Sequence, residues 1–142
     1  MFILLAYLGT SLAAVPDLRV VDRVIVGNAR SEQEHAYAGE GASNGIAQPH
    51  GWMRYALAVF DDTEVTIACT FGGSRGPRKF ELVVENKVIA TSTFNSSDSA
   101  TVEFRVPLAI TAGRTNILVV LRAADGPTPQ LLALRSVQDH NE

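Results

Sequence analysis

The chain has 142 residues, of which 46% are hydrophobic and 19% are charged, so it can bury enough apolar surface to fold as one domain and is not intrinsically disordered. Its formal net charge of −3 argues against a nucleic-acid-binding protein, which needs a basic surface. The single cysteine, Cys69, excludes an intramolecular disulfide and a metal site built from several cysteines.

Residues 1–16 form a hydrophobic leader that ends before the first charged residue, Asp17. The apolar run from Phe2 to Ala14 has the length of a signal-peptide core. It is too short to cross a hydrocarbon layer of about 30 Å with margin, so we expect no lasting membrane anchor. The leader predicts a secreted or periplasmic protein, although no basic residue precedes the run. The alternative is a start just upstream of a domain that normally follows something larger.

Residues 17–142 are predicted to form a single β-sandwich domain. Apolar and polar residues alternate in short runs bounded by turn residues, which is typical of half-buried strands. No stretch repeats apolar residues at helical spacing, so no helix is expected after the leader. About eight antiparallel strands predict an all-β fold, a two-layer and jelly-roll-like sandwich. The predicted strands are Val20–Val26, Trp52–Phe60, Glu64–Phe71, Arg78–Glu85, Lys87–Phe94, Thr101–Val106, Asn116–Ala123 and Leu131–Val137.

One face of each predicted strand is expected to be buried between the two layers. Glu85-Asn86 predicts a tight hairpin, because asparagine tolerates a positive φ. Replacing Phe80 or Phe104 by alanine is expected to cost about 3–5 kcal/mol through the cavity that it leaves. The predicted core consists of Val65, Ile67, Cys69, Phe80, Leu82, Val84, Val102, Phe104, Val119 and Leu121.

The stretch from Gly27 to Gly51 breaks the alternation and is interpreted as a long loop, and ordered loops of this length are usually functional. His35 with Glu32 and Glu34 could serve as a hydrolytic centre or bind a metal. In an extended segment, however, the two carboxylates point to one side and the imidazole to the other, so we predict neither a metal nor a cofactor. The alternative is that His35 and a neighbouring glutamate pin the loop to the sandwich through hydrogen bonds.

Trp52 is the only tryptophan, and Tyr55 follows three residues later, so the two rings are expected on opposite faces of a strand. An exposed indole is a platform for a sugar face, whereas a buried one would plug the end of the core, and both interpretations remain open. Arg75 lies in a glycine-rich turn with two further basic residues. These either pair with acids of the preceding long loop or form a solvated basic turn.

The sequence also contains a series of blocks: Asp22-Arg23-Val24 through Gly27, Ser31-Glu32 and His35, Gly51-Trp52 with Tyr55 to Val59, Phe71-Gly72 with Arg75-Gly76 and Arg78, and Phe80 to Val84 with Ile89-Ala90. In this order and spacing they resemble the substrate-binding domain of glycoside hydrolase family 146, a β-sandwich that follows the α-helical catalytic barrel of bacterial β-L-arabinofuranosidases. The resemblance covers roughly Leu18 to Val137. It departs at Asn28, where the family has an acid, and at Gln48-Pro49-His50, where the family has an additional Trp-Arg segment.

The resemblance implies a non-catalytic, carbohydrate-associated module that helps a family 146 enzyme hold an arabinose-containing glycan. The implied partners are that glycan and the catalytic barrel. The barrel's glutamate and cysteine cluster has no counterpart in this chain, so we expect no enzyme activity. The alternative function is a packing module that docks on the barrel without contacting sugar. The predicted ligand-binding residues are Arg30, Glu32, His35, Trp52 and Arg75.

Overall fold

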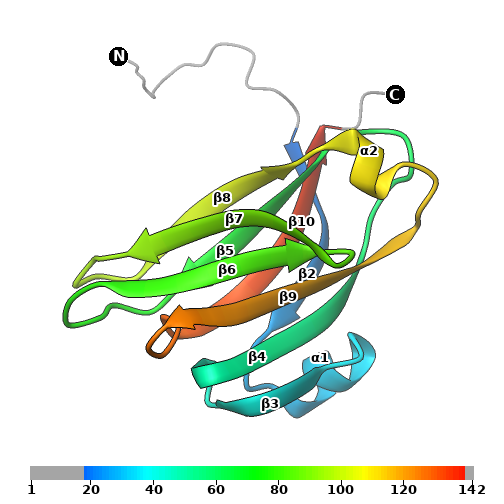
Figure 1. Ribbon diagram of the computed structural model, residues 1–142. Coiled ribbons are helices and arrows are strands. Elements are labelled where there is room, and N and C mark those ends of the chain that lie inside the picture. The colour runs from blue at the N-terminus through cyan, green and yellow to red at the C-terminus, as the bar shows by residue number, and fades with distance from the viewer. Residues whose placement is uncertain (1–17, 140–142) are drawn as a thin grey trace.

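The computed structural model describes residues 18–139, so the leader expected in residues 1–16 lies outside the described part. Two antiparallel sheets pack face to face, with the five-stranded sheet in front of the four-stranded one in Figure 1. The predicted all-β sandwich is therefore confirmed. The four-stranded sheet has the order β2 (Leu18–Ile25), β10 (Leu131–Asp139), β5 (Val65–Phe71), β8 (Ala100–Val106), and the five-stranded sheet has the order β3 (Ala38–Ser43), β4 (Ile46–Ala58), β9 (Asn116–Asp125), β6 (Arg78–Val84), β7 (Lys87–Phe94).

All eight predicted strands are present, but the interpretation of Gly27–Gly51 as a long loop is wrong. The segment forms helix α1 (Ala29–Glu34), strand β3 and the first part of β4. The expectation that no helix follows the leader is also wrong, because a second short helix, α2 (Leu108–Thr111), precedes β9. Strand β3 contains only small residues besides one glutamate, and its side chains are mostly exposed. It therefore lacks the apolar alternation by which the other strands can be recognised.

Two tight turns with left-handed residues close the hairpins of the five-stranded sheet. The expected turn between β6 and β7 has φ values of 50° at Glu85 and 66° at Asn86. The turn between β3 and β4 has φ values of 53° at Asn44 and 77° at Gly45. Two successive positive φ values are the mark of a type I′ hairpin, for which Asn-Gly is the strongest sequence signal. Asn44-Gly45 is therefore the sequence signal for this hairpin, and hence for a strand before β4.

Helix α1 is short but is capped at both ends. The side chain of Asn28 accepts a hydrogen bond of 2.9 Å from the backbone N–H of Ser31. At the other end the N–H groups of Ala36 and Tyr37 bond back to the carbonyls of Gln33 and Glu32, respectively. This is the Schellman pattern, in which the residue after the helix adopts a left-handed conformation and is usually glycine. Ala36 occupies that position with φ 53°.

Replacing Ala36 by glycine is expected to stabilise the domain. A left-handed conformation costs an alanine about 1–2 kcal/mol, and the extra chain entropy of glycine in the unfolded state offsets part of this relief. We therefore expect the free energy of unfolding to rise by roughly 0.5–1 kcal/mol, measured by urea denaturation. The matched control is Ala29→Gly in α1, which is expected to lower it. An Ala36→Gly protein that is less stable than the wild type would contradict the assignment.

The hydrophobic core lies between the sheets and contains eight of the ten predicted residues. The prediction that Val102 and Phe104 are core residues needs correction. Both face inward but are only partly buried, because β8 is the edge strand of its sheet. Cys69 is buried in β5, and burial raises the pKa of its thiol to about 12. The thiol therefore stays protonated and packs as a small apolar group.

Candidate functional site

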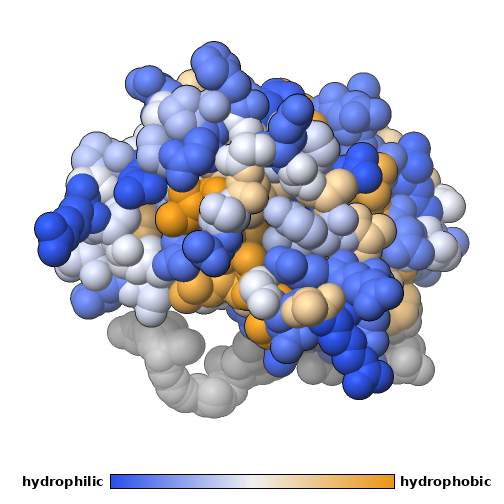
Figure 2. Space-filling view, turned by 90° about the horizontal axis from the view of Figure 1, so that it is seen from below, coloured by the Kyte–Doolittle hydropathy of each residue, from blue (hydrophilic) through white to orange (hydrophobic). Residues whose placement is uncertain are grey.

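Three of the predicted site residues, His35, Glu32 and Arg30, lie on or next to helix α1. This helix and the β3–β4 hairpin lie at the lower end of the sandwich in Figure 1. Seen from below, hydrophilic residues cover most of this end, and hydrophobic ones gather in its middle (Figure 2). Arg30 is strongly exposed and pairs with Glu34 one helical turn away, at 3.2 Å. Such an exposed pair contributes little to stability.

His35 joins three elements of the structure through its side chain and backbone. Its Nδ1 is 2.6 Å from the carbonyl oxygen of Ser31, and its Nε2 is 2.8 Å from Oδ1 of Asp22 in β2. Its own carbonyl accepts a hydrogen bond of 2.7 Å from the N–H of Ala56 in β4. The second carboxylate oxygen of Asp22 accepts from the N–H of Ala58, at 2.8 Å. The histidine thus connects α1, β2 and β4.

The environment of this pair favours its charged form. Burial alone would lower the pKa of His35, but the hydrogen bonds to Asp22 and to the Ser31 carbonyl, with the nearby carboxylate charges, raise it above its ordinary value. Burial alone would raise the pKa of Asp22, but the donors from Ala58, His35 and the Arg23 N–H lower it. Both neighbours of the imidazole are acceptors, so the protonated ring can donate from both of its nitrogens, and these contacts favour that form.

Glu32 is also bound internally. Its Oε2 accepts hydrogen bonds from the N–H of Gly27, at 2.9 Å, and from the hydroxyl of Tyr55, at 3.3 Å. Burial, together with the charge of Glu32, raises the pKa of Tyr55 well above its ordinary range, so the hydroxyl stays protonated and donates. His35 and Glu32 therefore fix α1 to the sandwich, as in the pinning interpretation, through both ring nitrogens of His35 and through Oε2 of Glu32.

Trp52 lies on the outer face of the five-stranded sheet. In β4 the residues Met53, Tyr55 and Leu57 are buried, whereas Trp52 and the residues at alternate positions point away from the core. The prediction that Trp52 and Tyr55 occupy opposite faces is confirmed, and the indole does not plug the core.

The indole belongs to a row of polar side chains that crosses the sheet. Glu40 in β3 pairs with Trp52, Trp52 with Arg122 in β9, and Arg122 with Glu81 in β6. Glu40 accepts a hydrogen bond of 3.3 Å from the indole Nε1, and Glu81 Oε1 is 2.8 Å from both Nε and Nη2 of Arg122. These contacts hold the indole and the guanidinium of Arg122 in place on strands that are themselves rigid.

A groove of about 250 Å³ opens beside this row. Leu118 and Val120 of β9 supply apolar surface, and Leu118 is 42% exposed. The indole of Trp52 lies on one side, and hydrogen-bonding groups come from the Asn86 turn and from two arginines. The lining residues are Trp52, Arg54, Asn86, Leu118, Val120 and Arg122.

Arg54 is the arginine of the groove to which residues 18–139 supply no acidic partner. Its guanidinium carbon lies 5.9 Å from the centre of the Trp52 ring, within the range of a cation–π contact. Among the described residues its guanidinium makes no hydrogen bond or ion pair, and the Nε atom is buried without a partner. A partly buried guanidinium with unused donors is costly to keep in the free protein, and an oxygen-rich ligand would satisfy the terminal donors.

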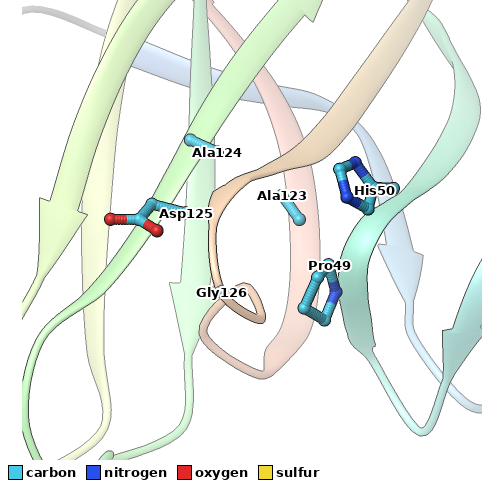
Figure 3. Close-up of a pocket in the computed structure, with 6 residues that line it drawn as sticks. All are labelled: Pro49, His50, Ala123, Ala124, Asp125 and Gly126. Atoms are coloured by element: carbon cyan, nitrogen blue, oxygen red, sulfur yellow. The ribbon is translucent and has the colours of Figure 1, made fainter.

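A second hollow of about 230 Å³ lies further along the same two strands. The pairing of β4 with β9 ends at Trp52 and Arg122, and the strands separate beyond it. Figure 3 shows Pro49 and His50 on one side of the gap and Ala123 on the other, with the carboxylate of Asp125 pointing away from His50. His50 is therefore the residue whose polar side chain faces this hollow.

Arg75 lies apart from the other predicted site residues, in the loop between β5 and β6. It lines a hollow of about 240 Å³ with Arg78 and Gln130. The structure therefore divides the five predicted ligand-binding residues among three places. The sequence analysis did not identify Arg54 and Arg122 as site residues. Arg54 lies on the same outer face of β4 as Trp52, and Arg122 lies opposite Trp52 in β9.

Neither a metal centre nor a membrane span is found in residues 18–139. No group of three or more His, Cys, Asp or Glu side chains there is arranged to hold a metal ion. In the same part of the chain, no helix has the length and apolar character needed to cross a bilayer.

A protein-family model matches residues 17–135 of the chain, and this family is described as a family of unknown function, DUF6805. No curated protein sequence matches the chain. Solved structures with the same fold include a family 36 carbohydrate-binding module in complex with calcium and xylotriose, with a TM-score of 0.56, 11% identity, and coverage of 80% of this chain and 98% of that one.

Two further structures extend the likeness. A family 35 carbohydrate-binding module from Clostridium thermocellum has a TM-score of 0.51 and 11% identity, covering 84% of this chain and 96% of that one. A family 115 4-O-methyl-α-glucuronidase with specificity for decorated arabinogalactans has a TM-score of 0.62 and 11% identity. There the match covers 94% of this chain but only 19% of the other. At such identities the likeness establishes the fold.

Proposed function

We propose that this chain, which belongs to the DUF6805 family of unknown function, is a non-catalytic carbohydrate-binding β-sandwich. The observation that carries the proposal is the groove beside Trp52, where a half-buried indole, apolar floor residues and an arginine without an acidic partner meet on a rigid sheet. The fold likeness to carbohydrate-binding modules supports this function.

The chemistry of the groove matches that of a sugar. A pyranose or furanose ring presents C–H groups that pack on an indole or on aliphatic side chains, and hydroxyl oxygens that accept hydrogen bonds. Leu118 and Val120 provide the apolar contact, while Arg54, Arg122 and Asn86 provide donors. Because these residues stand on strands or in a tight turn, little ordering is needed when a ligand binds.

Arabinose-containing glycans are the first ligands to test. The order of the sequence blocks resembles the substrate-binding domain of glycoside hydrolase family 146, and this resemblance supports both an arabinose-containing ligand and a catalytic barrel as partner. A secreted or periplasmic location fits the same proposal, since such glycans lie outside the cytoplasm, and the hydrophobic leader supports it.

The proposal is tested by replacing the indole and measuring affinity. We expect Trp52→Ala to weaken binding of arabinan or arabinogalactan oligosaccharides at least tenfold, about 1.4 kcal/mol, in isothermal titration calorimetry. Trp52→Phe keeps an aromatic face and is expected to retain most of the affinity. The matched control is Leu132→Ala, which removes an apolar side chain that is 39% exposed from β10 in the other sheet.

The outcomes separate the two functions considered. If a folded Trp52→Ala protein binds glycan as tightly as the wild type, the groove is not the binding site. Wild-type protein that gives no heat with any glycan at millimolar concentration would contradict carbohydrate binding and favour the packing module.

A further inference from the structure

The hollow that contains Arg75 lies where several loops meet, and it shares no residue with the Trp52 groove. It has a volume of about 240 Å³. The loop between β5 and β6 supplies three of its residues, and the starts of β4 and β6 and the connection from β9 to β10 supply the others. They are Ile46, Gly73, Ser74, Arg75, Arg78 and Gln130.

The backbone of this hollow is held in one conformation by its neighbours. The N–H of Gly72 donates to the Gln130 carbonyl at 2.9 Å, and the N–H of Ser74 donates to the Ser96 carbonyl at 2.8 Å. Gly73 has no room for a side chain, because a Cβ atom there would collide with the carbonyl of Ser97. The segment before Arg75 is thus fixed to two other loops, which constrains the backbone that leads to Arg75, while the residue itself is exposed.

The second arginine is anchored through one of its amino groups. Nη1 of Arg78 donates to the carbonyl of Thr128 at 3.0 Å, and Thr128 is fully buried and bonded through its own side chain and backbone to Ala47. The side chain of Arg78 is therefore attached to a rigid part of the sandwich, and its remaining donors are available at the hollow.

The two arginines of the hollow have no acidic partner in the described part of the chain. None of its lining residues is acidic, and within residues 18–139 neither arginine forms an ion pair. Two acids lie near these loops: Asp98, whose backbone N–H is close to Gly73, and Asp125, which is opposite Lys79 in the sheet, and neither forms an ion pair with Arg75 or Arg78. Elsewhere Arg30, Arg105, Arg114 and Arg122 each pair with a glutamate.

We propose that this hollow binds the oxyanion of an acidic sugar, a carboxylate or a sulfate group. Guanidinium groups recognise such oxyanions through two parallel N–H···O bonds, and a charge-assisted bond is about twice as strong as a neutral one. The hollow is smaller than the pockets of about 300–1,000 Å³ that enclose drug-sized ligands, so it fits one acidic sugar unit and not a longer piece of glycan. The proposal does not depend on the Trp52 groove.

The test uses the full chain and NMR titration of backbone amides, with galacturonate, galactose 6-sulfate and neutral galactose as probes. We expect the two acidic sugars to shift the amides of Gly73, Ser74 and Arg75 saturably, and galactose to leave them unchanged. The shifts should weaken as salt is added, because screening reduces the attraction. A stronger response to one acidic probe identifies whether carboxylate or sulfate is preferred.

Variants assign the effect to the arginines. Arg75→Gln is expected to weaken binding of the acidic probes about tenfold, and Arg78→Lys, which keeps the charge but loses the fork, by a smaller factor. The matched control is Arg105→Gln, which removes an exposed arginine from β8 and is expected to have no effect. Circular dichroism melting checks that each variant is folded.

The proposal is overturned if neutral galactose shifts the same amides equally, if Arg75→Gln binds like the wild type, or if no probe shifts these amides at tens of millimolar. Trp52→Ala is expected to leave the shifts of Gly73 unchanged. The test of glycan binding at the Trp52 groove and the test of oxyanion binding at this hollow therefore use different residues and different ligands, so one proposal can fail without the other.

Discussion

Replacing Phe80 by alanine is expected to lower the free energy of unfolding by about 3–5 kcal/mol, roughly a third to a half of the stability of an ordinary domain. Phe80 is 1% exposed in β6, and its ring centre lies 5.1 Å from that of Phe71 and 5.9 Å from that of Phe104. Removing it leaves a cavity between the two sheets that neighbouring side chains on strands can fill only in part. Urea denaturation followed by far-ultraviolet circular dichroism measures the change.

Phe104→Ala serves as the control for this prediction. The sequence alone assigned it the same cost, but Phe104 is only partly buried on the edge strand β8, so solvent can occupy part of the vacated space. We expect its cost to be clearly smaller than that of Phe80→Ala. A Phe80→Ala protein with an unshifted midpoint, or a larger loss for Phe104→Ala, would contradict the position of the core.

His35→Gln is expected to lower the free energy of unfolding by about 1.5–3 kcal/mol near pH 5, the range for a hydrogen bond to a charged group. The sign of the pH dependence follows from the two pKa changes. The pKa of His35 is raised, so its contribution is fully present below about 6.5 and is lost as the pH rises through the raised value. The pKa of Asp22 is lowered, so its contribution is present above about 3.8 and is lost on acidification.

Unfolding curves at pH 5 and pH 8.5 measure this prediction. The wild type is expected to lose stability between the two values through this pair, and His35→Gln should show a smaller difference. The variant is also expected to bind glycan with unchanged affinity, because the imidazole faces Asp22 and Ser31 and not the Trp52 groove. A loss of affinity without a loss of stability would instead assign His35 to the binding site.

The fold could largely be predicted from the sequence because most strands carry their own signal. Val65, Ile67 and Cys69 alternate with polar or small residues in β5, and Phe80 and Leu82 alternate with Lys79 and Glu81 in β6. Period-two alternation is a local property, so it survives without knowledge of the partner strands. The buried and outer positions of β4 followed from the same parity.

Helix α1 and strand β3 were not predicted because their signals differ from the usual ones. The left-handed residue after α1 is Ala36 instead of glycine, which hides the end of the helix. Strand β3 is held mainly by its pairing with β4, and its small side chains bury little surface. Asn44-Gly45 was the available indication of the hairpin.

The groove could not be predicted because it depends on pairing between distant strands. Trp52, Arg122 and Glu81 become neighbours only through the order β4-β9-β6. Likewise, His35 drew attention as a titratable group in a polar segment, but its partner Asp22 comes from another strand, which makes it a structural link. Sequence spacing identifies candidate side chains, and the sheet order determines which of them meet.

The central claim, that the Trp52 groove holds a glycan, is tested most directly by the fluorescence of the protein itself. Trp52 is the only tryptophan in the chain, so its emission reports on the groove without a label. Titration with arabinan and arabinogalactan oligosaccharides is expected to give a saturable shift of the emission to shorter wavelength, because the sugar excludes water from the indole. An emission spectrum that stays unchanged up to millimolar glycan, while calorimetry detects binding, would place the glycan elsewhere and contradict the claim.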